Sequence, residues 1–130
     1  IHQSGGKYID TPWIKKEHQG HGKYRYSFNY TGKRNKFGMI FLLRNVVFEP
    51  SDERGFDWSE YALKQIEVAF SLKKPAVISS HRVNFCGHIE ERNREKGIIE
   101  LKRFLKKIVS RWPDVEFMSS HQLLSLIENE

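Results

Sequence analysis

One histidine follows a predicted buried strand directly, in a position where its ring could exchange protons with a substrate. The apolar run at residues 76–78 is followed by Ser79, Ser80 and His81. An imidazole changes its protonation state near neutral pH, so a histidine at the carboxyl end of a strand is well placed as a general acid or base. A histidine that only makes structural hydrogen bonds is the alternative interpretation.

An arginine interrupts the most apolar segment of the chain. Residues 37–48 are almost all apolar, apart from Arg44 and Asn45. Such continuity predicts a strand buried on both faces. Because a buried guanidinium without a partner is costly, we expect Arg44 to face a carboxylate or open water. It is either a site residue or one half of a structural salt bridge.

A row of aromatic residues alternates with polar ones in residues 23–30. Tyr24, Tyr26, Phe28 and Tyr30 stand at every second position, and lysines and arginines flank them. This period is typical of a strand with one aromatic face. The face could stack on bases or sugar rings beside cations that suit phosphates. A face packed into the core is the alternative.

Two further histidines carry little signal for a metal site. His18 and His21 are three residues apart, but glycines surround them in residues 13–22, which we predict to be a loop. A zinc site needs a third or fourth ligand, and no third ligand stands nearby in a recognisable motif. The sequence also lacks a glycine-rich phosphate loop and a Gly-x-Ser-x-Gly motif, so a nucleotide site or a serine hydrolase has no support.

The composition describes one ordinary domain. The chain has 130 residues, and its 22 Lys+Arg against 16 Asp+Glu leave a net charge of +6. With 38% hydrophobic and 13% aromatic residues, intrinsic disorder is excluded. The single cysteine, Cys86, excludes an internal disulfide. No apolar run approaches the roughly 20 residues of a membrane span.

The elements that would position these residues alternate along the chain. Asp57 with Glu60, and Ser119 with Gln122, have the spacing of helix N-terminal capping boxes. Alternating strands and helices favour parallel strands covered by helices, an α/β fold. The predicted strands are 7–9, 24–30, 37–48, 76–78 and 115–117, and the predicted helices begin near Trp58, span 91–111 and follow Ser119.

Several of these segments closely resemble the C-terminal part of polysaccharide deacetylase-like proteins. The resemblance covers most of the chain in the same order. It implies the C-terminal half of a distorted (β/α) TIM-like barrel, with about four mainly parallel strands and covering helices, in which residues 1–130 form a single unit. The matching segments are 74–85 (KPAVISSHRVNF), 93–94 (NR), 111–120 (RWPDVEFMSS), 30–33 (YTGK), 44–45 (RN) and 48–51 (FEPS).

The resemblance implies metal-dependent hydrolysis of acetyl groups on a carbohydrate. In such proteins a divalent metal such as zinc polarises the acetyl carbonyl and activates water, an aspartate acts as base and a late histidine protonates the leaving group. His81 matches that histidine, and Arg44 matches an arginine that orients the aspartate. Arg82, Asn84 and Trp13 are the expected substrate-binding residues. The family's paired aspartates and metal-binding histidines have no counterpart here, so no metal ligand is assigned in this chain. We therefore expect the chain by itself to be catalytically inactive.

Two other functions stay open. A non-catalytic carbohydrate-binding or assembly domain would use Trp13, Tyr24, Tyr26 or Trp58 as stacking surfaces. A nucleic-acid binder would use the basic aromatic segment and is the least favoured. Half of a barrel would leave two unpaired sheet edges, so we expect a missing N-terminal half, a second copy or an exchanged strand to cover them. The resemblance points to the cell envelope or the extracellular space, and the sequence does not fix the compartment.

Overall fold

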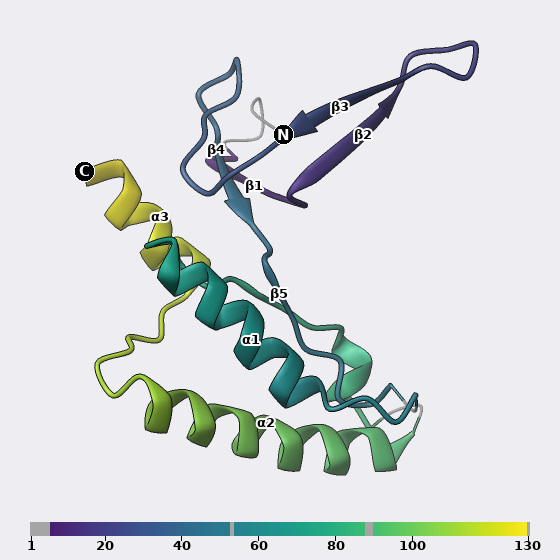
Figure 1. Cartoon of the computed structure of the whole chain (residues 1–130), viewed down its shortest axis with the longest axis vertical. Coiled ribbons are helices and arrows are strands. Elements are labelled where there is room, and N and C mark those ends of the chain that lie inside the picture. Colours follow the sequence, from purple (N-terminus) through teal and green to yellow (C-terminus); the bar gives the residue numbers. More distant parts are fainter. Residues whose placement is uncertain (1–5, 53, 88–89, 130) are drawn as a thin grey trace. The chain divides into compact units, whose positions relative to one another are not determined.

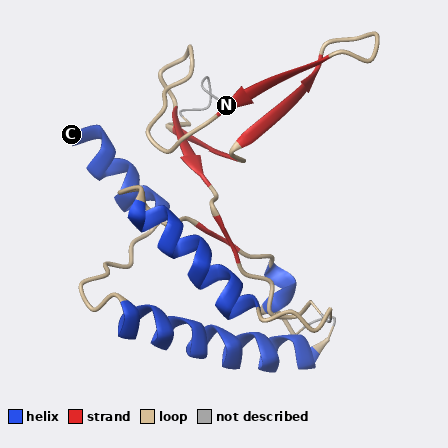
Figure 2. Ribbon diagram, in the orientation of Figure 1, coloured by secondary structure: helices blue, strands red, loops and turns tan. Residues whose placement is uncertain are grey.

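The computed structural model describes residues 6–52, 54–87 and 90–129 as a mixed α/β chain. In this part of the chain, six strands form three two-stranded sheets, two parallel and one antiparallel, and three α-helices accompany them (Figures 1 and 2). The described strands close no barrel. The chain divides into two compact units, one of Ile1–Asn45 with Phe117–Glu130 and the other of Val46–Glu116.

The first unit contains a parallel strand pair. β1 (Tyr8–Thr11) lies beside β4 (Ile40–Leu43) with Tyr8 opposite Ile40. Ile40 and Leu42 are fully buried, and they alternate with half-buried residues along β4. The prediction of one continuous strand over 37–48 is wrong, because β4 ends at Leu43 and the next strand has a different partner.

An antiparallel hairpin completes the sheets of this unit. It joins β2 (Ile14–His18) to β3 (Tyr24–Phe28). Its turn has positive φ angles at Gly20, His21 and Gly22. The two glycines adopt such angles without strain. The strand predicted at 24–30 is present but ends at Phe28, and the loop predicted at 13–22 is wrong over 14–18 and correct at the turn, 19–22. Both faces of β2 are largely exposed. Its sequence is therefore mostly polar and lacks the alternation of apolar and polar residues that predicts a strand.

The last helix of the chain, α3 (Ser120–Asn129), begins as its sequence predicts. The Ser119 hydroxyl accepts a hydrogen bond from the Gln122 backbone N–H at 3.3 Å, and the Gln122 side chain accepts one from the Ser119 N–H at 2.8 Å. This reciprocal pair is a capping box. The strand predicted at 115–117 is wrong, because these residues adopt no regular structure.

The second unit follows the predicted order of strand, helix, strand and helix. Its elements are β5 (Val46–Val47), α1 (Trp58–Ser71), β6 (Ile78–Ser79), the short 3₁₀-helix η2 (Arg82–Asn84) and α2 (Glu91–Arg111). β5 and β6 are parallel, and α1 and α2 lie side by side (Figure 1). The predicted bounds of α2 are confirmed, and β6 lies slightly later than predicted. In the described residues, no helix is long and apolar enough to cross a membrane.

The core of the second unit anchors its two strands. The Phe48 and Phe104 rings stack with their centroids 4.6 Å apart, which joins the end of β5 to α2. The predicted cap of α1 is confirmed, because Asp57 accepts the Glu60 N–H at 3.0 Å. The carboxyl end of β5 is therefore fixed against α2, and β6 is held by its pairing with β5. The buried core residues are Val46, Phe48, Ala62, Leu63, Ile66, Phe104 and Ile108.

Candidate functional site

A glutamate and a histidine meet at the carboxyl ends of two neighbouring parallel strands. Glu49 follows β5 by two residues, and His81 follows β6 by the same distance. Because Val47 lies opposite Ser79, the two side chains emerge at the same edge of the pair. The Nδ1–H of His81 donates to Oε1 of Glu49 at 2.8 Å. Strand ends of parallel sheets are where α/β proteins gather their functional residues.

The two partners differ strongly in exposure. The His81 side chain is 80% exposed, and the Glu49 side chain is only 16% exposed. The covered carboxylate occupies Nδ1 and leaves the other ring nitrogen, Nε2, as the one that a substrate can reach. An imidazole held in this way can accept a proton at Nε2 when it is neutral and donate one when it is charged. The pair can therefore exchange protons with a bound molecule.

A fully buried asparagine ties these strand ends together. The Nδ2 atom of Asn84 lies 2.6 Å from Glu49 Oε2, 3.0 Å from Ser80 Oγ and 2.9 Å from the His81 carbonyl oxygen. Its Oδ1 atom accepts the Ser51 backbone N–H at 3.1 Å. Asn84 thus fixes the second oxygen of Glu49 and the backbone next to His81. These contacts make it a positioning residue.

A glycine in α2 allows Asn84 to occupy this place. A Cβ atom at Gly97 would lie 1.7 Å from the Asn84 carbonyl oxygen and 2.9 Å from its carbonyl carbon. Both are backbone atoms, so a larger side chain could not be accommodated by a rotamer change. Gly97 therefore brings the helix backbone against η2 and secures the loop that carries Asn84.

The loop after Glu49 carries an ion pair of its own. The Asp52 N–H donates to the Glu49 carbonyl oxygen at 3.0 Å, which forms a turn. Arg54 Nε donates to Asp52 at 2.8 Å, and this hydrogen bond lowers the pKa of Asp52 below its ordinary value. Asp52 therefore stays ionised, and Arg54 in the same loop balances its charge.

The structure groups some of the predicted site residues and separates others. His81 and Asn84 belong to one hydrogen-bonded cluster, and the exposed Arg82 begins η2 between them. Trp13 and Arg44 belong to the first unit. Arg44 is exposed, and it forms no ion pair with the rest of the described chain, so its side chain faces water. The roles of Trp13, Arg44 and Arg82 in a site, and the contact of Asn84 with substrate, stay predictions.

Sequence reasoning missed three contributors to this cluster. Glu49 belongs to the segment 48–51 of the resemblance but was assigned no site role, although a polar residue after a buried strand is the signal that singled out His81. Ser51 was missed because its hydrogen bond to Asn84 joins distant parts of the chain. Gly97 carried a usable signal, since an isolated glycine inside a helical pattern often marks close packing.

The cluster does not fit a metal ion. Nowhere in residues 6–52, 54–87 and 90–129 do three His, Cys, Asp or Glu side chains converge as ligands. His81 has one carboxylate partner, and Asn84 occupies the other oxygen of that carboxylate. We therefore assign no step of this site to a metal.

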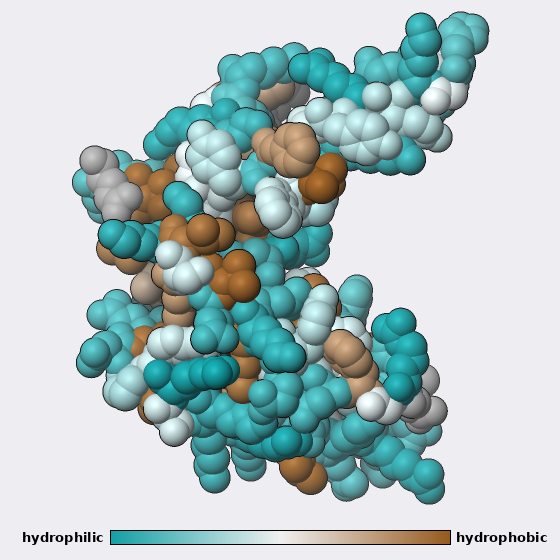
Figure 3. Space-filling view, in the orientation of Figure 1, coloured by the Kyte–Doolittle hydropathy of each residue, from teal (hydrophilic) through white to brown (hydrophobic). Residues whose placement is uncertain are grey.

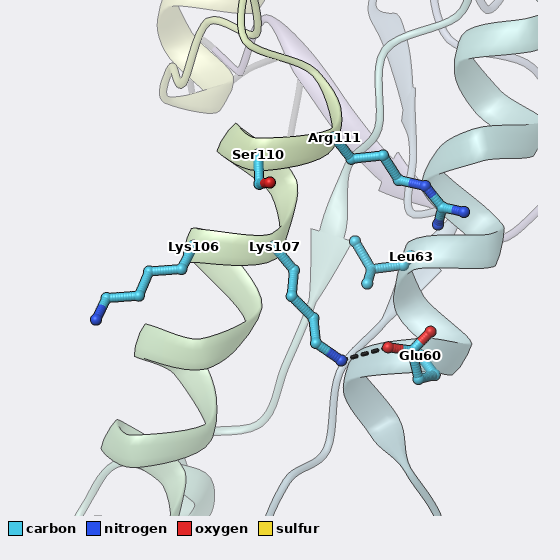
Figure 4. Close-up of a pocket in the computed structure, with 6 residues that line it drawn as sticks. All are labelled: Glu60, Leu63, Lys106, Lys107, Ser110 and Arg111. Carbon is cyan, nitrogen blue, oxygen red and sulfur yellow. Dashed lines mark hydrogen bonds and ion pairs between the residues drawn. The ribbon is translucent and has the colours of Figure 1, made fainter.

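A separate groove of about 610 Å³ lies between α1 and α2. Figure 4 shows Lys107 reaching across it to Glu60, with which it forms an ion pair, while Lys106 points away. The groove is open to solvent and shares no lining residue with the Glu49–His81 cluster. Its lining residues are Glu60, Leu63, Lys106, Lys107, Ser110 and Arg111.

Comparisons with known proteins identify no relative. No family model matches the chain, and neither the curated proteins nor the solved structures yield a match.

Proposed function

We propose that this chain supplies the proton-donating histidine of a polysaccharide deacetylase-like hydrolase that acts on an acetylated carbohydrate. In this proposal the chain is the C-terminal half of the family's barrel, and His81 is the general acid. The observation that carries the proposal is the Glu49–His81 hydrogen bond at the carboxyl ends of adjacent parallel strands. The resemblance implies a catalytic histidine at a strand end of this kind.

The residues of the cluster have distinct roles in the proposed reaction. Water adds to the acetyl carbonyl carbon, the bond from that carbon to the sugar oxygen or nitrogen breaks, and acetate leaves. His81 Nε2–H gives its proton to the departing sugar atom. Glu49 holds the ring through Nδ1, and Asn84 holds Glu49.

The proposal assigns the base and the metal-binding residues of the family to parts of the complete protein other than the described residues. The described cluster has one carboxylate, and that carboxylate already accepts hydrogen bonds from His81 and Asn84. We therefore expect the chain alone to release no acetate. Each described strand pairs with one other strand, and β4 also forms a bridge to Arg34; the remaining edges are ones that a missing half, a second copy or an exchanged strand would cover.

Acetate release tests the proposal directly. The natural gene product that contains this chain is incubated with acetylated chito-oligosaccharides and acetylated xylan. The His81→Gln variant should lower kcat about 100-fold or more, because a positioned general acid contributes about 10²–10⁴. His121→Gln is the matched control, since His121 is an exposed histidine on α3.

Two outcomes would overturn the proposal. One is undiminished acetate release by His81→Gln, and the other is no acetate release from either substrate by the unaltered protein. The role of Glu49 has its own readout. In ¹⁵N NMR the neutral His81 ring should carry its proton on Nδ1, and Glu49→Ala should reduce the population of that form because the acceptor is gone.

A further inference from the structure

One face of the β2–β3 hairpin is an exposed surface of rings and cations. Residues opposite one another in an antiparallel pair lie on the same face of the sheet. Tyr26 is 56% exposed and Phe28 is 63% exposed, so the expectation that this aromatic row packs into the core is wrong. Figure 3 shows pale and tan side chains among teal ones in the region of the hairpin. We call this the ring face, made of Ile14, Lys16, His18, Tyr24, Tyr26 and Phe28.

The rings of this face are not equivalent. The Lys16 ammonium lies 3.9 Å from the Tyr24 ring centroid, and His18 meets Tyr24 edge-on at 5.2 Å. Tyr24 is therefore already engaged by two neighbours. Lys16 also lies 6.0 Å from the Tyr26 ring. Tyr26 and Phe28 are left as exposed rings on the same face, with the Lys16 ammonium beside Tyr26.

The hairpin region also holds all of the chain's net charge. Residues 13–37 contain seven of the 22 lysines and arginines but only one of the 16 acidic residues, which leaves 15 of each outside this segment. That single acid, Glu17, pairs at 2.6 Å with Lys15, and both lie on the face opposite the ring face. The ring face therefore carries Lys16 and no acidic residue, and it lies in a segment with a net charge of +6, which suits an anionic partner.

We propose that the ring face binds an acidic polysaccharide. Sugar rings would lie on Tyr26 and Phe28, and the carboxylate or sulfate groups of the polymer would pair with Lys16 and the neighbouring cations. The row from Tyr24 to Phe28 is about 14 Å long at the usual rise of a strand, enough for more than one sugar. The inference goes beyond the proposed function, because it assigns the chain a binding surface outside the Glu49–His81 cluster, and it rests on that function for the choice of a sugar polymer. A single-stranded nucleic acid is the competing anionic polymer for such a face, and the binding experiment includes it.

Affinity electrophoresis and calorimetry can measure the binding. The probes are polygalacturonic acid and dextran sulfate, and their neutral counterparts are methyl-esterified polygalacturonate and dextran. A thymidine oligonucleotide tests the competing ligand. We expect the full chain to bind both acidic polymers, to bind the neutral counterparts at least about tenfold more weakly, and to lose affinity as salt rises.

Matched variants locate the surface. Phe28→Ala should weaken binding about tenfold or more, while Phe117→Ala, at a phenylalanine that is 57% exposed elsewhere in the chain, should leave it unchanged. Lys16→Ala should weaken binding more than Lys15→Ala, because the two lysines lie on opposite faces. Tyr26→Trp should keep affinity and Tyr26→Ile should lose it, although both residues favour a strand, which separates loss of the ring from loss of the fold.

Several results would overturn the inference: failure to bind either acidic polymer, equal binding of the neutral forms, tighter binding of the oligonucleotide, or equal effects of Phe28→Ala and Phe117→Ala. A dimer that buries the ring face would also overturn it. None of these measurements uses acetate release. Failure of this inference is therefore distinguishable from failure of the proposed hydrolase.

Discussion

The strand ends of the second unit and the hairpin of the first unit both present polar side chains and rings, but they support them differently. At the strand ends, the exposed His81 is attached to the covered Glu49, which a fully buried Asn84 holds in turn. On the hairpin, Tyr26 and Phe28 project into solvent. The first arrangement fixes the position of one reactive atom, Nε2 of His81. The second exposes a surface on which a larger molecule could bind.

The two arrangements suit two different functions, proton transfer and polymer binding. Proton transfer requires a donor held within a fraction of an ångström by supporting contacts. Binding a polymer requires exposed rings and charges that tolerate small shifts. Substitutions around Asn84 should therefore change the free energy of unfolding, and substitutions on the ring face should change binding alone.

Gly97→Ala should have the largest effect. The added Cβ would collide with the Asn84 carbonyl, and we expect a loss of about 3 kcal/mol, the upper range for an overpacked site. Urea unfolding measures it, with Glu95→Ala, at an exposed position of the same helix, as control. An ordinary helix position would give the opposite sign, because alanine stabilises a helix over glycine by about 1 kcal/mol. A more stable Gly97→Ala protein would therefore exclude the close approach of α2 to η2.

Asn84→Ala should have the next largest effect. It leaves Glu49 Oε2 and the Ser51 N–H without their partner. An unsatisfied buried polar group costs about 1–3 kcal/mol, so we expect a loss of about 2 kcal/mol in urea unfolding. Asn93→Ala, on the first turns of α2, should change stability far less. If both variants unfold alike, Asn84 does not hold the strand ends.

The cap of α1 predicts a smaller effect that depends on pH. The Glu60 N–H donates to Asp57 and lowers the pKa of that carboxyl when the chain is folded. A lowered folded pKa gives stability that is present above the unfolded pKa and is lost as the pH falls through the folded pKa. Asp57→Ala should therefore be less stable by about 1 kcal/mol at pH 7, and the gap should shrink below about pH 4. Thermal unfolding at several pH values measures it, and a gap that widens in acid would contradict the cap.

The helices could be predicted because their signals are local. α2 was predicted from its apolar stripe, and α1 and α3 from the capping residues Asp57 and Ser119, whose hydrogen bonds span three residues. The short strands β5 and β6 depend on pairing with each other across about 30 residues of chain. That pairing is tertiary, so their bounds could not be predicted from the local pattern.

The candidate site, like the fold, could be predicted only where its signal is local in the sequence. His81 could be singled out because it follows an apolar strand directly in the sequence. Its partner Glu49 is chosen by the register of β5 and β6, and the space for Asn84 is set by a glycine in a distant helix. Single residues could be nominated from sequence, but their grouping required the fold. The hairpin shows the converse, because its alternation predicted the strand at Tyr24–Phe28 but not which way its rings face.

Lys16→Ala should have the smallest effect on stability. An exposed ammonium over an aromatic ring contributes about 0.5–1 kcal/mol, and Lys16 has such a contact with Tyr24. We expect the midpoint of urea unfolding to shift by no more than that, while affinity for polygalacturonic acid falls measurably. Asn84→Ala should show the reverse, a large loss of stability with unchanged polymer affinity of the folded chain. If Lys16→Ala instead unfolds the chain as readily as Asn84→Ala, the ring face is structural, and the two regions do not differ in the way that their contacts indicate.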